Sequence, residues 1–189
     1  MPPGNKPGKC FINFRQILPS QHIIHINCGE YENTKMKPII WKNNPNFPRP
    51  TMNDSISPIW AKQNENEILF NKSTYNAFYH TDLETYLLKH KIDTIYICGM
   101  LTSICVHKTA VGGISCGFNT IIIDDCCIDR SLDRHNMTLQ LYKDYIYTTV
   151  SLHEIVDMCS SNSNNNNSSC VCDCDIDTDT TTTGTTITK

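Results

Sequence analysis

Short β-branched runs alternate with helical patterns along most of this chain, and this alternation restricts its fold more than any other feature. Apolar runs typical of strands lie at residues 22–27, 68–70, 94–98, 120–124 and 145–148. Helical patterns follow most of them. The alternation predicts a three-layer α/β/α, Rossmann-like fold with a mostly parallel sheet flanked by helices. In such folds the functional groups gather at the carboxyl ends of the strands.

Three segments carry signals for the start of a helix. Residues 81–84 (Thr-Asp-Leu-Glu) and 151–154 (Ser-Leu-His-Glu) have the form of a capping box. Thr102 is a plausible N-cap for a helix that carries Cys105. We therefore expect helices to begin at these three places.

Composition divides the chain into a folded domain and a tail. Residues 160–169 are almost entirely Ser and Asn, and residues 178–189 are almost entirely Thr. Such segments lack the apolar side chains that offset the entropy of ordering. We expect one domain over 1–159, a disordered tail over 160–189, and a proline-rich irregular insertion over 32–66, which either covers a pocket or is a solvated connection.

Charge and hydropathy exclude several classes of partner. The net charge is -3 and there is no long basic run, so no nucleic-acid or anionic membrane surface is predicted. No apolar stretch is long enough to cross a bilayer, and residues 1–6 lack the apolar core of a signal peptide. We expect a cytoplasmic protein that acts on a small molecule.

The chain contains 11 cysteines, an odd number in a sequence without a secretion signal. Reduced thiols are therefore expected, rather than a disulfide framework. Cys98 and Cys116 lie in apolar segments and are expected to be small core residues. Cys170, Cys172 and Cys174 alternate in the tail; a soft-metal site there is a possible reading, but the spacing differs from that of zinc knuckles.

Cys105 occupies a different setting, just after the run at 94–98, a glycine and a predicted helix start. The positive end of a helix dipole favours a thiolate over a thiol. A strand, a tight turn and a helix start therefore predict a reactive cysteine.

Three motifs in the segment 70–129 resemble those of the isochorismatase-like cysteine hydrolases, the superfamily of nicotinamidases and N-carbamoylsarcosine amidases. They are the lysine motif 71–78 (Asn-Lys-Ser-Thr-Tyr-Asn-Ala-Phe), the nucleophile motif 99–106 (Gly-Met-Leu-Thr-Ser-Ile-Cys-Val) with Thr109 and Ala110, and Gly117-Phe118 before the run at 120–125. Further residues resemble the N-carbamoylsarcosine amidase branch: Tyr31, Trp41, Lys42, residues 102–106, Asp129, Arg130, His135, Leu139 and 142–145.

This resemblance implies that Cys105 is a nucleophile that forms an acyl-enzyme with an amide or carbamoyl carbon, with Lys72 beside the thiol. The backbone amides of Leu101 and Cys105 would form the oxyanion hole, next to a cis peptide bond at Met100–Leu101. Substrate contacts are expected from a set of three side chains: Thr102, Phe78 and His135. Relatives are commonly homo-oligomers, and no cofactor is implied.

The chain departs from the family pattern in its first strand. That strand ends in the aspartate that serves as general base, whereas the first aspartate here is Asp54 and residues 10–19 resemble the helix that follows the strand. Truncation, degeneracy or a replacement base would each explain this; Glu30 and Glu32 are candidates for the last but are better explained as solvated loop acids. No Asp-x-His pattern lies between residues 30 and 66, so no metal site of the nicotinamidase type is expected.

The sequence therefore predicts a cysteine hydrolase that cleaves a carbon-nitrogen bond of a small amide or carbamoyl compound. The alternative is an inactive or truncated relative that retains the fold and binds a small molecule or a subunit. A metal-responsive or scaffold role of the Cys/Asn/Thr-rich tail ranks last.

Overall fold

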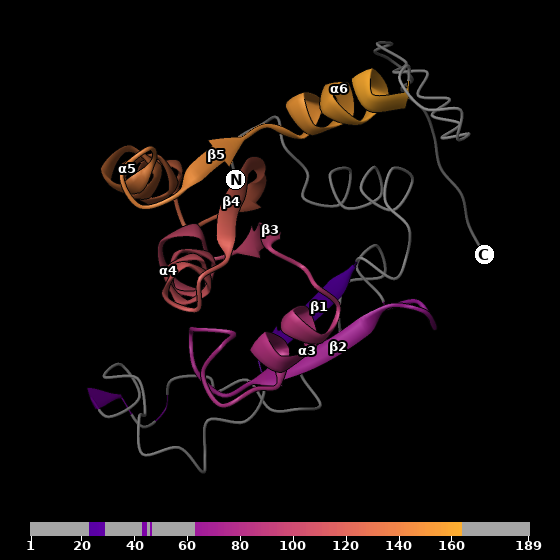
Figure 1. Cartoon of the computed structure of the whole chain (residues 1–189). Helices are drawn as coiled ribbons and strands as arrows, with labels where there is room; N and C mark the ends of the chain where they lie inside the picture. Colours follow the sequence, from indigo (N-terminus) through magenta and orange to yellow (C-terminus); the bar gives the residue numbers. More distant parts are fainter. Residues whose placement is uncertain (1–22, 29–42, 45, 47–62, 164–189) are drawn as a thin grey trace, which may run out of the picture.

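The computed structural model describes residues 23–28, 43, 44, 46 and 63–163 (Figure 1). Several predictions fall outside these residues. They concern residues 164–189 of the tail with its cysteine cluster, most of the insertion, residues 10–19, Glu30, Tyr31, Glu32, Trp41, Lys42 and Asp54. Residues 160–163, which were also predicted to be disordered, are helical.

The five described strands form two parallel sheets. In the first sheet, β1 (Ile24–Cys28) pairs with β2 (Ile68–Lys72), with Ile24 opposite Ile68. In the second, β4 (Asn119–Ile128) lies between β3 (Thr94–Met100) and β5 (Thr148–Val150). No described strand lies between the two sheets, which Figure 1 shows apart from one another.

The last strand begins later than the sequence predicted. Residues 145–147 form a turn in which the amides of Tyr145 and Ile146 donate to the carbonyl of Tyr142. Asp144 adopts a positive φ of 60°, and the Tyr145 side chain is 85% exposed. The predicted strand at 145–148 is therefore wrong in its first three residues, and the observed strand begins at Thr148. The reason is that the chain reverses direction after the preceding helix.

Within the described residues, four α-helices follow the strands, namely α3 (Leu83–Lys89), α4 (His107–Ser115), α5 (Leu132–Tyr142) and α6 (Leu152–Ser163). The capping box before α6 is confirmed, since the Ser151 amide donates to the Glu154 carboxylate at 2.6 Å and the Glu154 amide donates to the Ser151 hydroxyl at 3.3 Å. At 81–84 a helix begins as predicted, but the reciprocal capping box does not form. Asp82 is the N-cap of α3 without a side-chain bond, and the Thr81 hydroxyl accepts the amide of Leu83 at 3.3 Å while it donates to the carbonyl of Ala77.

Adjacent residues of β4 contact helices on opposite faces of the sheet. Ile122 packs in a cluster with Val106, Ala110 and residues of α5, whereas Ile123 packs with Leu152 and Ile155 at α6. Successive side chains of a strand point to opposite faces. The three-stranded sheet is thus covered on both sides, and the predicted α/β fold with parallel, helix-flanked sheets is confirmed.

The first sheet shares a separate apolar cluster with α3. Leu83 and Leu87 of the helix pack there with Phe78 and Phe118, and Ile24 and Ile26 of β1 lie against them half-buried. This cluster connects the two sheets on the α3 side.

The described cysteines differ in their state. Cys126 is disulfide-bonded, so the expectation of reduced thiols is wrong at this position. Cys116 is half-buried. Cys98 is exposed by its accessible surface, but desolvation by the surrounding atoms raises the pKa of its thiol to about 11. Cys98 lies on β3, the strand whose outer edge has no described neighbour.

Candidate active site

Lys72 and Cys105 meet at the carboxyl edge of the strands. Lys72 is the last residue of β2, and Cys105 lies five residues beyond the end of β3. The Lys72 Nζ donates to Cys105 Sγ at 3.3 Å and to the carbonyl of Thr74 at 2.9 Å. Lys72 is only 5% exposed. The fold therefore holds a buried ammonium against the thiol.

A tight turn carries Cys105 from the strand into the helix. The Met100–Leu101 peptide bond is cis, and residues Thr102–Val106 then form a π-helical turn that leads into α4. The residue at the N-cap is Leu101, without a side-chain bond, so the predicted capping role of Thr102 is wrong. The Leu101 carbonyl accepts the amides of Ile104 and Val106, each at 3.1 Å, and the Cys105 amide between them is not among its donors.

Helix α4 also contacts the loop that follows Lys72 in the sequence. The Thr109 hydroxyl accepts the buried amide of Ala77 at 3.1 Å and donates to the carbonyl of Tyr75 at 3.3 Å. Gly112 faces the amide group of Asn76 so closely that an added Cβ would overlap with it. Helix α4 therefore contacts the lysine motif through Thr109 and Gly112, and a larger residue at position 112 would displace the Asn76 side chain.

Asp129 anchors the π-helical turn from the end of β4. Its carboxylate accepts the Ser103 amide at 2.6 Å, the Arg130 amide at 2.7 Å and the Arg134 Nε at 3.3 Å. Burial opposes ionisation, but hydrogen bonds from Ser103, Arg130 and Arg134 outweigh it and lower the pKa of Asp129. In the sequence, Asp129 belongs to a motif that indicates no role for it. Only its contacts in the structure show that it anchors the π-helical turn.

We expect Asp129→Asn to weaken the fold by about 1–3 kcal/mol near neutral pH, because charge-assisted bonds to the turn are lost. A carboxyl group with a lower pKa in the folded than in the unfolded state stabilises the fold at a pH above the unfolded-state pKa. This stabilisation disappears as the pH falls through the folded-state pKa. The difference in the free energy of unfolding between wild type and Asp129→Asn should thus become smaller as the pH falls. Denaturant unfolding of both proteins from about pH 7 to pH 3 measures it.

Asp133→Asn is the matched control for this prediction, because Asp133 is exposed in the first turn of α5. It should change stability by less than about 0.5 kcal/mol. If Asp129→Asn lowers the free energy of unfolding by the same amount at neutral and at acidic pH, the charge of Asp129 does not stabilise the turn.

The three predicted substrate contacts lie in different surroundings. Thr102 is fully buried, and its hydroxyl lies 2.8 Å from Nδ1 of the half-buried His135. Phe78 is buried against Phe118, with ring centroids 5.7 Å apart. Thr102, the first residue of the π-helical turn, thus contacts His135, whereas Phe78 packs into the apolar cluster at α3.

Tyr75 is a neighbour of the thiol that the sequence did not single out. Burial raises the pKa of its phenol, and the thiols of Cys105 and Cys28 add to this effect through their charge. Cys28 ends β1. The Tyr75 phenol therefore senses both Cys105 and the end of β1, and its membership in the lysine motif was the one signal available beforehand.

Two classes of feature are not found in the described part of the chain. No group of three or more His, Cys, Asp or Glu side chains among residues 23–28 and 63–163 is arranged to hold a metal ion. No described helix has the length and apolarity to cross a membrane.

Comparison with known proteins identifies the family. The isochorismatase domain model matches residues 16–154. The isochorismatase family protein YecD of Escherichia coli O157:H7, itself uncharacterized, is 37% identical over 93 residues, which cover 49% of this chain and 50% of that protein. Maleamate amidohydrolase of Pseudomonas putida is 34% identical over 73 residues, which cover 39% of this chain and 34% of that enzyme.

The fold has a solved counterpart in N-carbamoylsarcosine amidase from Thermoplasma acidophilum, with a TM-score of 0.58 and 22% identity over 77% of this chain and 80% of that one. The matched segments span half or less of the two curated relatives. The domain match covers most of this chain, together with the strand edge that holds Lys72 and Cys105. The chain belongs to the isochorismatase family.

Proposed function

We propose that this chain carries the catalytic centre of a cysteine hydrolase that cleaves the carbon-nitrogen bond of a small amide or carbamoyl compound. The proposal rests above all on the 3.3 Å contact between Lys72 Nζ and Cys105 Sγ. A buried cation beside a thiol favours the thiolate, which is the nucleophilic form. Two of the similar proteins are named for a carboxamide and a carbamoyl substrate, which supports this substrate class.

In the first step, Sγ of Cys105 attacks the carbonyl carbon and a carbon-sulfur bond forms. Negative charge then develops on the carbonyl oxygen. The amide of Cys105, which the Leu101 carbonyl does not accept, and the amide of Leu101 are the donors proposed for this oxyanion. The carbon-nitrogen bond breaks, the amine leaves with the proton of the thiol, and an acyl-enzyme remains.

In the second step, water attacks the thioester carbon. The carbon-sulfur bond breaks, the acid is released, and the thiol regains a proton. Lys72 would stabilise the sulfur anion in both steps through its hydrogen bond. Thr102 and His135, which lie next to the turn, are proposed to contact the substrate; the packing of Phe78 against Phe118 favours a role in shaping the apolar wall instead.

The test is ammonia release from a panel of unsaturated dicarboxylic monoamides, aromatic carboxamides and N-carbamoyl amino acids, followed by mass analysis of the quenched protein. We expect turnover of at least one class and an acyl mass on the peptide that contains Cys105. An acyl mass on another cysteine would contradict the assignment of the nucleophile.

A second candidate, a binding protein without turnover, is favoured by one observation. Among the described residues, no carboxylate is hydrogen-bonded to Cys105 or Lys72. A general base commonly contributes about 100-fold to 10,000-fold to the rate. Saturable binding of a panel compound without ammonia release would support this candidate.

A further inference from the structure

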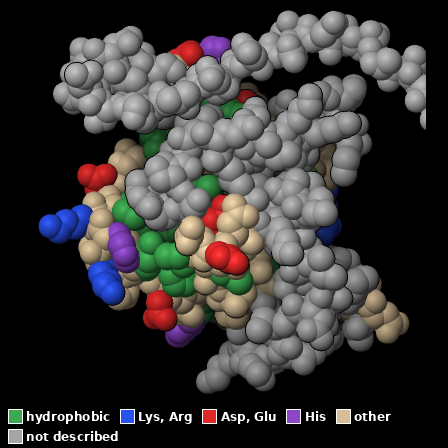
Figure 2. All heavy atoms as spheres, turned by 90° about the vertical axis from the view of Figure 1, so that its right-hand side faces the viewer, with side chains coloured by type: hydrophobic (Ala, Val, Ile, Leu, Met, Phe, Trp, Pro, Cys, Tyr) green, Lys and Arg blue, Asp and Glu red, His purple; other side chains and the backbone are tan. Residues whose placement is uncertain are grey.

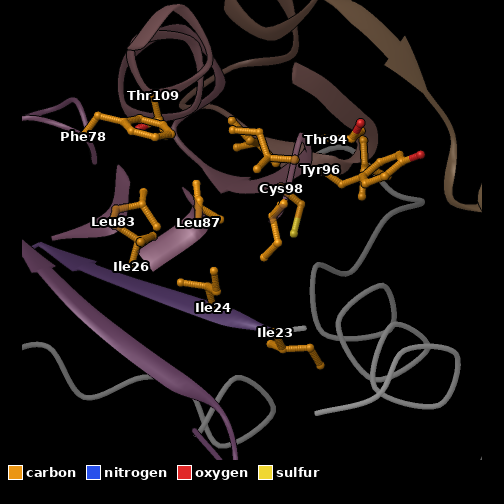
Figure 3. A pocket seen from close by; sticks show the side chains of 14 residues that line it. Ile23, Ile24, Ile26, Phe78, Leu83, Leu87, Thr94, Tyr96, Cys98 and Thr109 are labelled. Atoms are coloured by element: carbon orange, nitrogen blue, oxygen red, sulfur yellow. The ribbon is translucent and has the colours of Figure 1, made fainter. Parts of the chain in front are cut away.

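Alternate residues of β1 share one face of the first sheet, and the last of them is a cysteine. Ile24 and Ile26 point into an apolar groove of about 440 Å³ between the two sheets, whose other wall follows β3 from Thr94 to Cys98 (Figure 3). Figure 2, seen from the right-hand side of Figure 1, shows hydrophobic side chains gathered at the centre of the described surface. Because successive side chains of a strand point to opposite faces, Cys28 lies on the same face as Ile24 and Ile26.

This cysteine lies next to the lysine of the candidate active site. In the parallel register of the first sheet, Ile26 is opposite Phe70 and Cys28 is opposite Lys72. Ile26 and Phe70 pack in the same apolar cluster, so the paired residues of β1 and β2 share a face. Neighbouring strands lie about 4.8 Å apart. The Lys72 backbone therefore lies beside Cys28, while its ammonium donates to Cys105 Sγ at 3.3 Å.

Tyr75 is a second indication that the two thiols lie close together. Burial raises the pKa of its phenol most, and the charges of Cys105 and Cys28 raise it further. Such effects between charges are largely screened beyond about 10 Å at physiological salt. One phenol therefore lies within reach of both sulfurs. Cys28 and Cys105 are half-buried and Tyr75 is 37% exposed, so a small solute can reach this edge.

The cation beside Cys105 makes this thiol the first of the pair to react. Peroxides oxidise thiolates, and the susceptibility of a cysteine follows its thiolate character and exposure. Burial raises the pKa of the Cys116 thiol and raises that of Cys98 to about 11, so these two should react slowly. Cysteines that respond to oxidants commonly lie next to a second cysteine that resolves the oxidised form. Cys28 lies in that position relative to Cys105.

We propose that Cys28 and Cys105 form an oxidisable thiol pair, in which a hydroperoxide oxidises Cys105 and Cys28 then closes a reversible disulfide with it. The pair is a modification site that acts on the nucleophile itself. Its formation follows from the placement of the two cysteines alone. Its consequence, a reversible loss of amide hydrolysis, rests on the proposed function.

The chemistry consists of two balanced steps. First, the Cys105 thiolate attacks one oxygen of hydrogen peroxide, a sulfur-oxygen bond forms and the oxygen-oxygen bond breaks. The sulfur is oxidised to a sulfenic acid, the peroxide is reduced, and the leaving hydroxide takes up a proton to form water. Then the Cys28 sulfur attacks Sγ of Cys105, a sulfur-sulfur bond forms, and the sulfur-oxygen bond breaks. The hydroxide leaves as water with the thiol proton of Cys28. A dithiol reductant returns both thiols.

The test uses the full chain with Cys98→Ala, because Cys98 and Cys105 lie on one tryptic peptide, 92–108, whereas Cys28 lies on 16–35. The reduced protein is treated with a small molar excess of hydrogen peroxide, the remaining thiols are blocked, and the unreduced digest is analysed by mass. We expect a cross-link between these two peptides that dithiothreitol removes. Absence of this cross-link, or a disulfide from Cys105 to any other cysteine, would overturn the proposal.

Cys28→Ser removes the resolving thiol, and Cys116→Ser is the matched control, because Cys116 is also half-buried but lies at the end of α4. Without Cys28, the sulfenic acid of Cys105 should persist and react with dimedone, or proceed to a sulfinic acid that dithiothreitol does not reduce. After peroxide and dithiothreitol, recovery of alkylatable Cys105 should fall at least about threefold in Cys28→Ser and stay unchanged in Cys116→Ser. Equal recovery in both variants would contradict a resolving role. If Cys28→Ser does not fold, the cross-link map decides.

Hydrolysis assays separate this proposal from the proposed function. We expect ammonia release to fall as the cross-link forms and to return with dithiothreitol. A cross-link in a protein that hydrolyses no compound of the panel would support the thiol pair and contradict the hydrolase. Hydrolysis that peroxide abolishes and dithiothreitol does not restore would support the cysteine hydrolase and overturn the thiol pair.

Discussion

Replacing Cys105 with alanine is expected to lower amide hydrolysis by at least about 1,000-fold, because the proposed acyl-enzyme forms on the Cys105 thiol. The acyl mass found after quenching should disappear as well. The change is small, and Cys105 is half-buried, so the unfolding transition should stay within about 1 kcal/mol of wild type. Ammonia release and denaturant unfolding measure the two effects.

Cys98→Ala is the matched control for this experiment. Cys98 is exposed and lies on the strand that leads to the nucleophile turn, but the Lys72 ammonium donates to Cys105 and not to Cys98. Its replacement should leave turnover within about twofold of wild type. Turnover that survives Cys105→Ala and is lost in Cys98→Ala would place the nucleophile elsewhere.

Replacing Lys72 with methionine is expected to slow alkylation of Cys105 by iodoacetamide at neutral pH by about tenfold or more. Methionine keeps the apolar stem but removes the cation that is 3.3 Å from the sulfur. The thiolate fraction, and with it the rate of alkylation, should fall. The carbonyl of Thr74 also loses its donor, so we expect a loss of stability of about 1–3 kcal/mol.

Site-resolved mass analysis distinguishes these effects. Lys89→Met, an exposed position on α3, is the control and should change neither the rate nor the stability. Cys116 serves as an internal reference, because burial and Glu84 raise the pKa of its thiol and its alkylation should be slow in every variant. Equal alkylation of Cys105 and Cys116 in wild type would contradict the activation of Cys105 by Lys72.

The elements with a strong local pattern were predicted most accurately. The runs at 94–98 and 120–124 correspond to β3 and β4, and the capping box at 151–154 starts α6 as expected. These signals depend on neighbouring residues only. The strand at 145–148 was misplaced because the chain reverses at Asp144. At 81–84 the helix begins as predicted, but Thr81 accepts the amide of Leu83 instead of forming the reciprocal box with Glu84.

The residues of the candidate site were recognised from motifs, but their arrangement was not. A motif indicates that Lys72 and Cys105 belong together, while their distance depends on two strands that are far apart in sequence. Asp129 likewise anchors the π-helical turn through Ser103, which lies 26 positions earlier in the sequence. No local pattern reports such contacts.

The sequence by itself determined the α/β alternation, the polar tail composition and the identity of the cysteine and lysine, because periodicity and motif are properties of neighbouring residues. Only the tertiary structure decided that these strands form two sheets with an apolar groove between them, and that β1 and β3 form the walls of that groove. The physical reason is that a strand edge becomes visible as unpaired only when all its potential neighbours are placed in space.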